Sequence, residues 1–155
     1  MATWITPITD RSQEDVDRIR ELDTKGYYNL TEAEKTEWES DSKGALNTSD
    51  LERIENNIKV ISDMLDMKVS LLDVPELPNV SYFTNLLSRS RDIRVKALAD
   101  KYSNTILPEQ PLNKYWHWNM IEQFLFDVFT VLEANERAIL YMTDDVELYV
   151  DSEVI

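Results

Sequence analysis

The sequence predicts a mainly α-helical protein, a small bundle of about five helices with a C-terminal β-hairpin or exchanged strand. Apolar residues recur at alternating intervals of three and four over 51–65 and again over 118–132, which places them on one face of a helix. Two proline-bounded stretches, 74–78 and 108–111, separate the helical patterns because proline and the residue before it both disfavour helix. A length of 155 residues suits a single domain.

The N-terminal part, residues 1–67, is expected to contain short helices followed by one long helix. Ser12 and Asp15 can cap the first helix, and a second is predicted from Glu32 to Ser40. The long helix is predicted to face inward with Leu51, Ile54, Ile58, Ile61 and Leu65, and outward with Glu52, Arg53, Glu55, Asn56, Asn57 and Lys59.

The middle part, residues 81–135, is expected to supply two longer helices, at 82–101 and 112–135. Asn79 or Ser81 can cap the first of them. Its outer face is basic, and pairing with acidic neighbours is favoured over docking of an acidic partner. That face comprises Arg89, Arg91, Arg94, Lys96 and Lys101.

The helix at 112–135 is apolar on more than one face. Such a helix either lies at the centre of a bundle or shares a face with another subunit, and the sequence leaves both open. The candidate interface residues on this helix are Trp116, Trp118, Phe126 and Phe129.

The last part, residues 138–155, is β-prone, with apolar runs at 139–142 and 146–150. A hairpin and a strand that pairs with another chain are equally compatible with it, because a two-stranded ribbon alone is marginal. Three further candidate interface residues lie here: Tyr141, Leu148 and Tyr149.

One phrase occurs twice, 18 residues apart: DTKGYYNLTEAE at 23–34 and DSKGALNTSDLE at 41–52. Lys followed by Gly is typical of a helix end, since glycine takes a left-handed conformation without steric cost. Ser or Thr followed three residues later by Glu is a capping box that starts a helix. Each copy is therefore predicted to end one helix and begin the next. The capping residues would be Gly26, Thr31 and Glu34 in the first copy, and Gly44, Ser49 and Glu52 in the second.

The phrase also has the length of an EF-hand calcium loop, but its chemistry opposes that function. Position 3 of the loop, an oxygen ligand in calcium sites, is Lys25 in one copy and Lys43 in the other. Position 6 is not glycine in either copy. The helix-capping interpretation is preferred.

Composition limits the chemistry. A net charge of −14 argues against a nucleic-acid surface and against binding to anionic membranes. The chain has no cysteine, and its single histidine, His117, lies between two tryptophans without a second ligand at metal-binding spacing. No catalytic residue, metal site or cofactor is assigned, and a non-enzymatic protein is expected. With no signal-peptide pattern and no membrane-spanning run, it is expected to be cytoplasmic on synthesis.

The N-terminal half resembles small proteins encoded in phages and prophages of Gram-positive gut bacteria. The resemblance rests on Trp4, Thr9–Ser12, Asp15–Val16, Lys43–Asn47 and Asp50–Asn57, within residues 4–61. Their shared pattern, KGxxN followed by DLxRIExN, is found in virion-structural or tail-associated proteins. The resemblance implies a structural role in a particle and supplies no catalytic residues.

The favoured function is thus a phage or prophage structural protein of the tail, fibre or baseplate region. It would self-associate as a homo-oligomer, dock to a larger virion protein and be located in the virion. The alternative is a cytosolic binding or adaptor module with an aromatic groove for a peptide or a sugar. A third interpretation, a hydrolase using carboxylates near the tryptophans, is supported by no motif.

Overall fold

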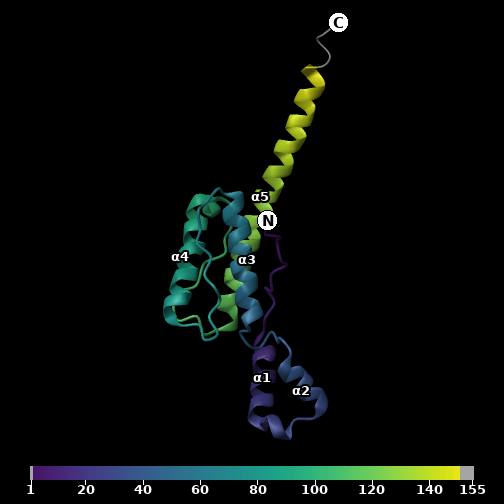
Figure 1. Ribbon diagram of the computed structural model, residues 1–155, viewed down its shortest axis with the longest axis vertical. Helices are drawn as coiled ribbons and strands as arrows, with labels where there is room; N and C mark the ends of the chain where they lie inside the picture. The colour runs from purple at the N-terminus through teal and green to yellow at the C-terminus, as the bar shows by residue number, and fades with distance from the viewer. Residues whose placement is uncertain (1, 151–155) are drawn as a thin grey trace.

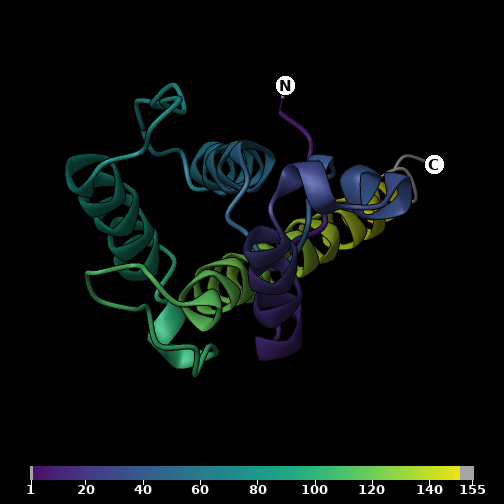
Figure 2. The same ribbon diagram turned by 90° about the horizontal axis from the view of Figure 1, so that it is seen from below.

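The computed structural model describes residues 2–150, with side chains described as far as Ile139. The described chain is mainly helical and contains no strand. Its helices are α1 (Gln13–Lys25), α2 (Glu32–Glu39), α3 (Thr48–Met64), α4 (Val80–Lys96) and α5 (Tyr115–Val150), with short 3₁₀ helices η1 (Tyr27–Asn29) and η2 (Ala99–Lys101). α3, α4 and the first half of α5 form the body, α1 and α2 form a hairpin at one end, and α5 projects from the other end (Figure 1). Viewed from the α1 end, α4 and α2 lie on opposite sides (Figure 2).

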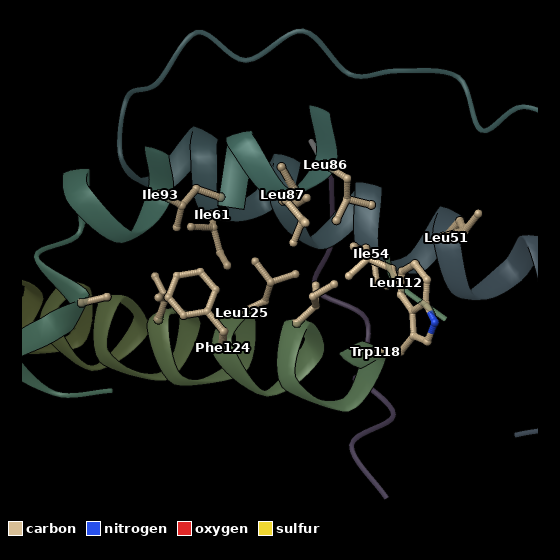
Figure 3. Close-up of a cluster of buried hydrophobic side chains, with 14 of the residues drawn as sticks. Leu51, Ile54, Ile61, Leu86, Leu87, Ile93, Leu112, Trp118, Phe124 and Leu125 are labelled. Carbon is tan, nitrogen blue, oxygen red and sulfur yellow. The ribbon is translucent and has the colours of Figure 1, made fainter. Parts of the chain in front are cut away.

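The core lies where α3, α4 and α5 meet, and it confirms the predicted apolar stripes. Leu86, Leu87 and Ile93 of α4 and Ile54 and Ile61 of α3 point towards Phe124 and Leu125 of α5 (Figure 3). The fully buried apolar residues of this core include Leu51, Ile54, Ile58, Ile61, Leu86, Leu87, Ile93, Ile121, Phe124, Leu125 and Val128. Burial of such side chains contributes about 1.5–3 kcal/mol each before conformational entropy is subtracted. This part of the bundle is therefore the main source of stability.

The N-terminal segment before α1 lies extended along α3 and α5, held by two asparagine side chains. Asn57 accepts a hydrogen bond from the Ile5 N–H (3.0 Å) and donates one to the Ile5 carbonyl (2.8 Å). Asn119 does the same for Arg11, at 3.2 and 2.8 Å. Each amide satisfies both backbone groups of one residue, as a neighbouring strand would. The segment is thereby fixed without a sheet.

The first copy of the repeated phrase ends α1 and starts α2. Gly26 is the C-cap of α1 with φ 74° and ψ 138°, and its N–H reaches the carbonyls of Leu22 and Asp23. Its positive φ suits glycine, although ψ is extended rather than left-handed helical. Thr31 and Glu34 form the capping box of α2.

The second copy works differently, and the prediction for Gly44 as a helix C-cap is wrong. α2 already ends at Glu39 with Ser40 as its C-cap, so Gly44 lies in a loop. A Cβ at Gly44 would stand 2.0 Å from the carbonyl oxygen of Asp15 and 2.8 Å from Ile19 Cγ1. Glycine is required here because the loop backbone presses against α1.

The predicted capping box of Ser49 and Glu52 is wrong as well. α3 begins two residues earlier, with Asn47 as its N-cap and Asp50 at the third helical position. The Asp50 carboxylate accepts hydrogen bonds from the Asn47 N–H (3.0 Å) and from its side-chain amide (3.2 Å). The cap at Asn47 is favoured over one at Ser49 because the Asp50 carboxylate completes the capping box and also contacts Arg11 and Arg53.

The later helices differ in extent from the prediction. α4 starts at Val80, with Asn79 accepting a hydrogen bond from the Tyr82 N–H (3.0 Å), and ends at Lys96 before the left-handed Leu98. α5 is helical through Val150, where a hairpin or exchanged strand was expected over 138–155. Residues 151–155 and the side chains from 140 onward lie outside the description, so the pairing of this segment stays a prediction.

Candidate functional site

The predicted interface residues of α5 fall into separate environments. Trp118 is a core residue, 4% exposed, with its ring edge-on to Phe83 at 5.5 Å between centroids. Phe129 stacks on Trp4, with ring centroids 4.0 Å apart and planes within 2°. Trp116 and Phe126 are each 42% exposed. The side chains of the other three predicted interface residues, Tyr141, Leu148 and Tyr149, lie outside the description. The structure therefore leaves Trp116 and Phe126 as surface candidates.

A buried cluster of two arginines and two carboxylates joins the N-terminal segment to α3 and α5. Arg11 contacts Asp50 (2.9 Å) and Glu122 (2.8 Å), and Arg53 contacts the same two acids at 2.6 and 2.8 Å. The Glu122 carboxylate also accepts a hydrogen bond from the Ile8 N–H (2.9 Å). Arg11, Asp50 and Glu122 have side chains no more than 4% exposed. Two positive charges balance two negative ones, and the carboxylates are hydrogen-bonded. This arrangement suits attachment of the N-terminal segment to α3 and α5 better than proton transfer.

The pKa shifts in this cluster agree with that role. Burial opposes the charge of Asp50, but hydrogen bonds from the Asn47 N–H and Arg53, and the charge of Arg11, keep the Asp50 pKa below its ordinary value. Hydrogen bonds to Glu122 and Asp50 raise the pKa of Arg53. Both groups are held in their charged forms, whereas a general acid or base needs a pKa near the working pH.

A second buried ion pair is formed by two residues that were predicted to lie on the surface. Arg89 of α4 and Glu55 of α3 were expected on outer faces, but they lie between the helices, bonded at 2.5 and 2.6 Å. Tyr82 donates a hydrogen bond to the same carboxylate (3.0 Å). Burial and the neighbouring charge of Glu55 raise the pKa of Tyr82. Arg89 thus pairs with an acidic neighbour, the favoured interpretation of the basic stretch, but does so in the interior.

Sequence reasoning missed these interior charges, and only one signal pointed to them. Glu122, beside Gln123, lies between Ile121 and Phe124 on a helix that is apolar on more than one face, where a solvated acid is out of place. Arg53, Glu55 and Asn57 gave no such signal, because they flank the apolar stripe of α3 at positions normal for an exposed face.

His117 lies at the start of α5 beside Trp116, with ring centroids 5.7 Å apart. Its Nδ1 is buried and has no hydrogen-bond partner among the described residues. Burial, and secondarily the charge of Lys114, lowers the pKa of His117. The neutral imidazole is favoured, in keeping with a packing role.

A cavity of about 360 Å³ lies between α1, the loop around Gly44 and the residues that lead into α5. Its walls combine apolar and aromatic side chains with cations, and no Asp or Glu lines it. The lining residues are Arg11, Gln13, Val16, Arg20, Lys43, Gly44, Ala45, Leu46, Leu112, Asn113, Lys114, Tyr115, Trp116 and Trp118. This basic pocket contains Trp116, one of the two exposed candidates.

Besides the basic pocket, a second candidate for binding another molecule is the C-terminal half of α5. This helix has 36 residues and a length of about 54 Å at 1.5 Å per residue. Its first half packs in the core, whereas residues 134–138 are exposed and this part of α5 leaves the bundle (Figure 1). A helix that extends beyond its own domain offers a surface for another chain.

Comparison with protein-family models, with curated proteins and with solved structures returned no match. Within the described residues, no helix is long and apolar enough to cross a membrane. The described part of the chain also holds no cluster of three or more His, Cys, Asp or Glu side chains suited to a metal ion.

Proposed function

We propose that this chain is a non-enzymatic assembly protein of a phage or prophage particle, in the tail, fibre or baseplate region. It self-associates and docks to a larger virion protein. The projection of α5 from the bundle is the observation that carries the assembly role (Figure 1). The particle assignment is supported by the resemblance of residues 4–61 to virion-structural proteins.

The projecting half of α5 needs a partner on physical grounds. Isolated helices of about 12–15 residues are marginal in water, since most helical stability in proteins comes from packing of one face. Residues 134–138 are exposed in the single chain, and Glu133 and Arg137 form one surface ion pair at 2.7 Å. Such a pair contributes about 0.3–0.5 kcal/mol, too little to maintain a long solitary helix.

The spacing of apolar residues extends through this half in the sequence. Trp118, Ile121, Leu125 and Val128 alternate by three and four and are buried in the core. The same alternation continues at Leu132, Asn135, Ile139, Met142, Val146 and Tyr149, which we name the α5 stripe. A seven-residue repeat of this kind is typical of a coiled coil. The positions opposite to it in the repeat are polar: Gln123, Thr130, Arg137 and Asp144.

A second copy of this chain is the partner that fits the stripe best. Asn135 interrupts the apolar positions, and a polar residue there is satisfied when the same residue of a parallel second helix lies opposite to it. An asparagine at such a position also fixes register and strand number at some cost in stability. We therefore expect a parallel pair of α5 helices.

Light scattering after size-exclusion chromatography, from about 1 to 100 µM, measures this self-association. The chain is expected to be a dimer at the upper end of that range. Met142→Glu places a charge on the stripe and should weaken the dimer by about 100-fold or more, whereas Ala134→Glu, outside the stripe, should leave it unchanged. A monomer at about 100 µM, or equal dimerisation of the two variants, would contradict the proposal.

The particle assignment has its own measurement. Mass spectrometry of purified particles from the host strain should detect the chain at a fixed ratio to the major tail proteins. Its absence from complete particles, with the chain present in the cell extract, would exclude a virion component.

A further inference from the structure

We propose that the basic pocket binds an acidic peptide segment of a partner protein, in which carboxylates flank an apolar anchor residue. The residues that line the pocket belong to α1, to the loop before α3 and to the start of α5, and none of them belongs to the α5 stripe. In the ribbon, α1 lies at the end of the bundle opposite to the projecting half of α5 (Figure 1). The inference therefore stands whether or not the chain dimerises through α5.

Part of the pocket lining is apolar. Val16 of α1, Leu46 of the loop and the buried Leu112 and Trp118 contribute to its walls. The volume of about 360 Å³ is at the lower end of the range of about 300–1,000 Å³ for ligand pockets. It suits one or two side chains better than a large cofactor. An apolar anchor inserted there would gain about 25 cal/mol per Å² of surface removed from water.

Cations also belong to the lining. Arg20, Lys43 and Lys114 come from three different segments and line the pocket together, without any carboxylate among the lining residues. This absence is unusual in a chain with 30 acids among 155 residues, for which about three acids would be expected in a lining of this size. The pocket is thus a locally basic site on an acidic protein.

These three cations are available to a ligand. Lys114 has no carboxylate within salt-bridge distance in the described chain and lies 5.8 Å from the centre of the Trp116 ring. Lys43 contacts Asp10 at 2.6 Å, but both side chains are well exposed. The Arg20 guanidinium and the Asp17 carboxylate are 3.6 Å apart, a long ion pair, and both side chains are exposed. Exposed pairs contribute about 0–1 kcal/mol, so a ligand carboxylate can replace either acid.

Arg11 also lines the pocket but does not add to its charge. Its guanidinium is neutralised by Asp50 and Glu122 and is 2% exposed. Arg11 instead fixes its part of the pocket wall to α3 and α5.

The lining favours a peptide over a sugar and over a nucleic acid. Sugar hydroxyls need acceptors as well as donors, and only the amides of Gln13 and Asn113 supply side-chain acceptors here beside the aromatic hydroxyl of Tyr115. A nucleic-acid strand carries a negative charge at every phosphate. Three cations can bind only a few of these phosphates, and the net charge of −14 on the protein repels the rest of the strand. A peptide with a few carboxylates beside one apolar anchor matches both the cations and the apolar side chains of the lining.

Titration of the full chain with designed peptides, followed by ¹H–¹⁵N NMR, tests the proposal. Each peptide has four glutamates on either side of a two-residue centre, which is Ala-Ala, Leu-Leu, Phe-Phe or Trp-Trp, and each has a copy with glutamine in place of glutamate. The four indole N–H signals report the site directly. Those of Trp116 and Trp118 should shift with at least one apolar-centred glutamate peptide, while those of Trp4 and Trp38 stay in place.

Affinity ratios then identify the chemistry. The glutamine copy should bind at least about 10-fold more weakly, and the Ala-Ala peptide at least about 5-fold more weakly. Lys114→Gln should reduce affinity about 5-fold, while Lys101→Gln, an exposed lysine outside the pocket, should not change it. Lys43→Gln provides a second variant on a different segment.

Several results would overturn the inference. No shift with any peptide excludes the ligand class, and equal binding of the glutamine copies excludes recognition of charge. Equal loss in Lys114→Gln and Lys101→Gln would reveal general electrostatic attraction instead of a site. Stronger shifts of the same indole signals by a ten-residue oligothymidylate would assign the pocket to single-stranded nucleic acid.

Discussion

The two copies of the repeated phrase are alike in sequence and different in structure. In the first copy Gly26 ends α1 and Thr31 caps α2, with Lys25 bound to Glu34 at 2.5 Å. In the second copy Gly44 lies in a loop, and the cap of α3 moves two residues forward to Asn47. The same residue types therefore serve local capping in one place and long-range packing in the other.

The difference comes from what lies next to each copy. The first copy joins two short helices at one end of the molecule, and its hydrogen bonds and ion pairs are to residues of α1 and α2 themselves (Figure 1). The second is pressed between α1 and the start of the buried bundle, with Asp50 in the charge cluster. Equivalent substitutions in the two copies should consequently have unequal effects.

The largest expected difference is between the two glycines. Gly44→Ala should destabilise the protein by about 4 kcal/mol, because the new Cβ meets the Asp15 carbonyl at 2.0 Å and the backbone has to move. Gly26→Ala should cost about 1–2 kcal/mol from the strain of a positive φ, because the new Cβ meets only an ordinary contact, Asn29 Nδ2 at 3.9 Å. Urea unfolding measures both, and a Gly44→Ala variant as stable as Gly26→Ala would show that the loop does not press on α1.

The next difference is between the acids at the tenth position of the phrase, Glu32 and Asp50. Asp50→Asn should cost about 3 kcal/mol, because Arg11 and Arg53 would share one carboxylate in the interior. Glu32→Gln should change stability by less than about 0.5 kcal/mol, since that side chain is 91% exposed. Thermal and urea unfolding of the pair provide the measurement. Similar small losses in both variants would mean that the charge cluster does not hold the N-terminal segment.

The smallest difference concerns pH and the last residue of each copy. Hydrogen bonds from Lys25 and from the Thr31 N–H lower the pKa of Glu34 to about 2 from an ordinary 4.5. A lowered pKa stabilises the folded protein fully above pH 4.5, and this stabilisation is lost as the pH falls towards 2. The stability deficit of Glu34→Gln should therefore be present at pH 6 and disappear near pH 2. Glu52→Gln removes no cap, because Asn47 and Asp50 cap α3, so its stability deficit at pH 6 should be smaller than that of Glu34→Gln. Equal deficits of the two variants at pH 6 would contradict the capping difference.

Much of the fold could be predicted because helical periodicity and proline are local signals. The stripes of Leu51–Leu65 and Trp118–Val128 identified the core faces, and the proline-bounded stretches separated the helices correctly. The aromatic surplus of α5 was compatible with a core or an interface, and sequence alone could not separate Trp118 in the core from Trp116 at the basic pocket. The two tryptophans are two residues apart at the start of one helix, and only the packing of the bundle shows which one is buried.

The sequence by itself determined the main helices as far as about residue 135 and the apolar stripes of α3 and α5, because hydrogen bonds within a helix and a repeat of 3.6 residues depend on neighbouring residues only. The tertiary structure decided which charges are buried, why Gly44 is glycine and where the basic pocket lies. Each of these depends on residues far apart in the chain, such as Arg11 with Glu122 or Gly44 with Asp15. The free energy of such a contact depends on a distance and a local dielectric that exist only once the helices have packed.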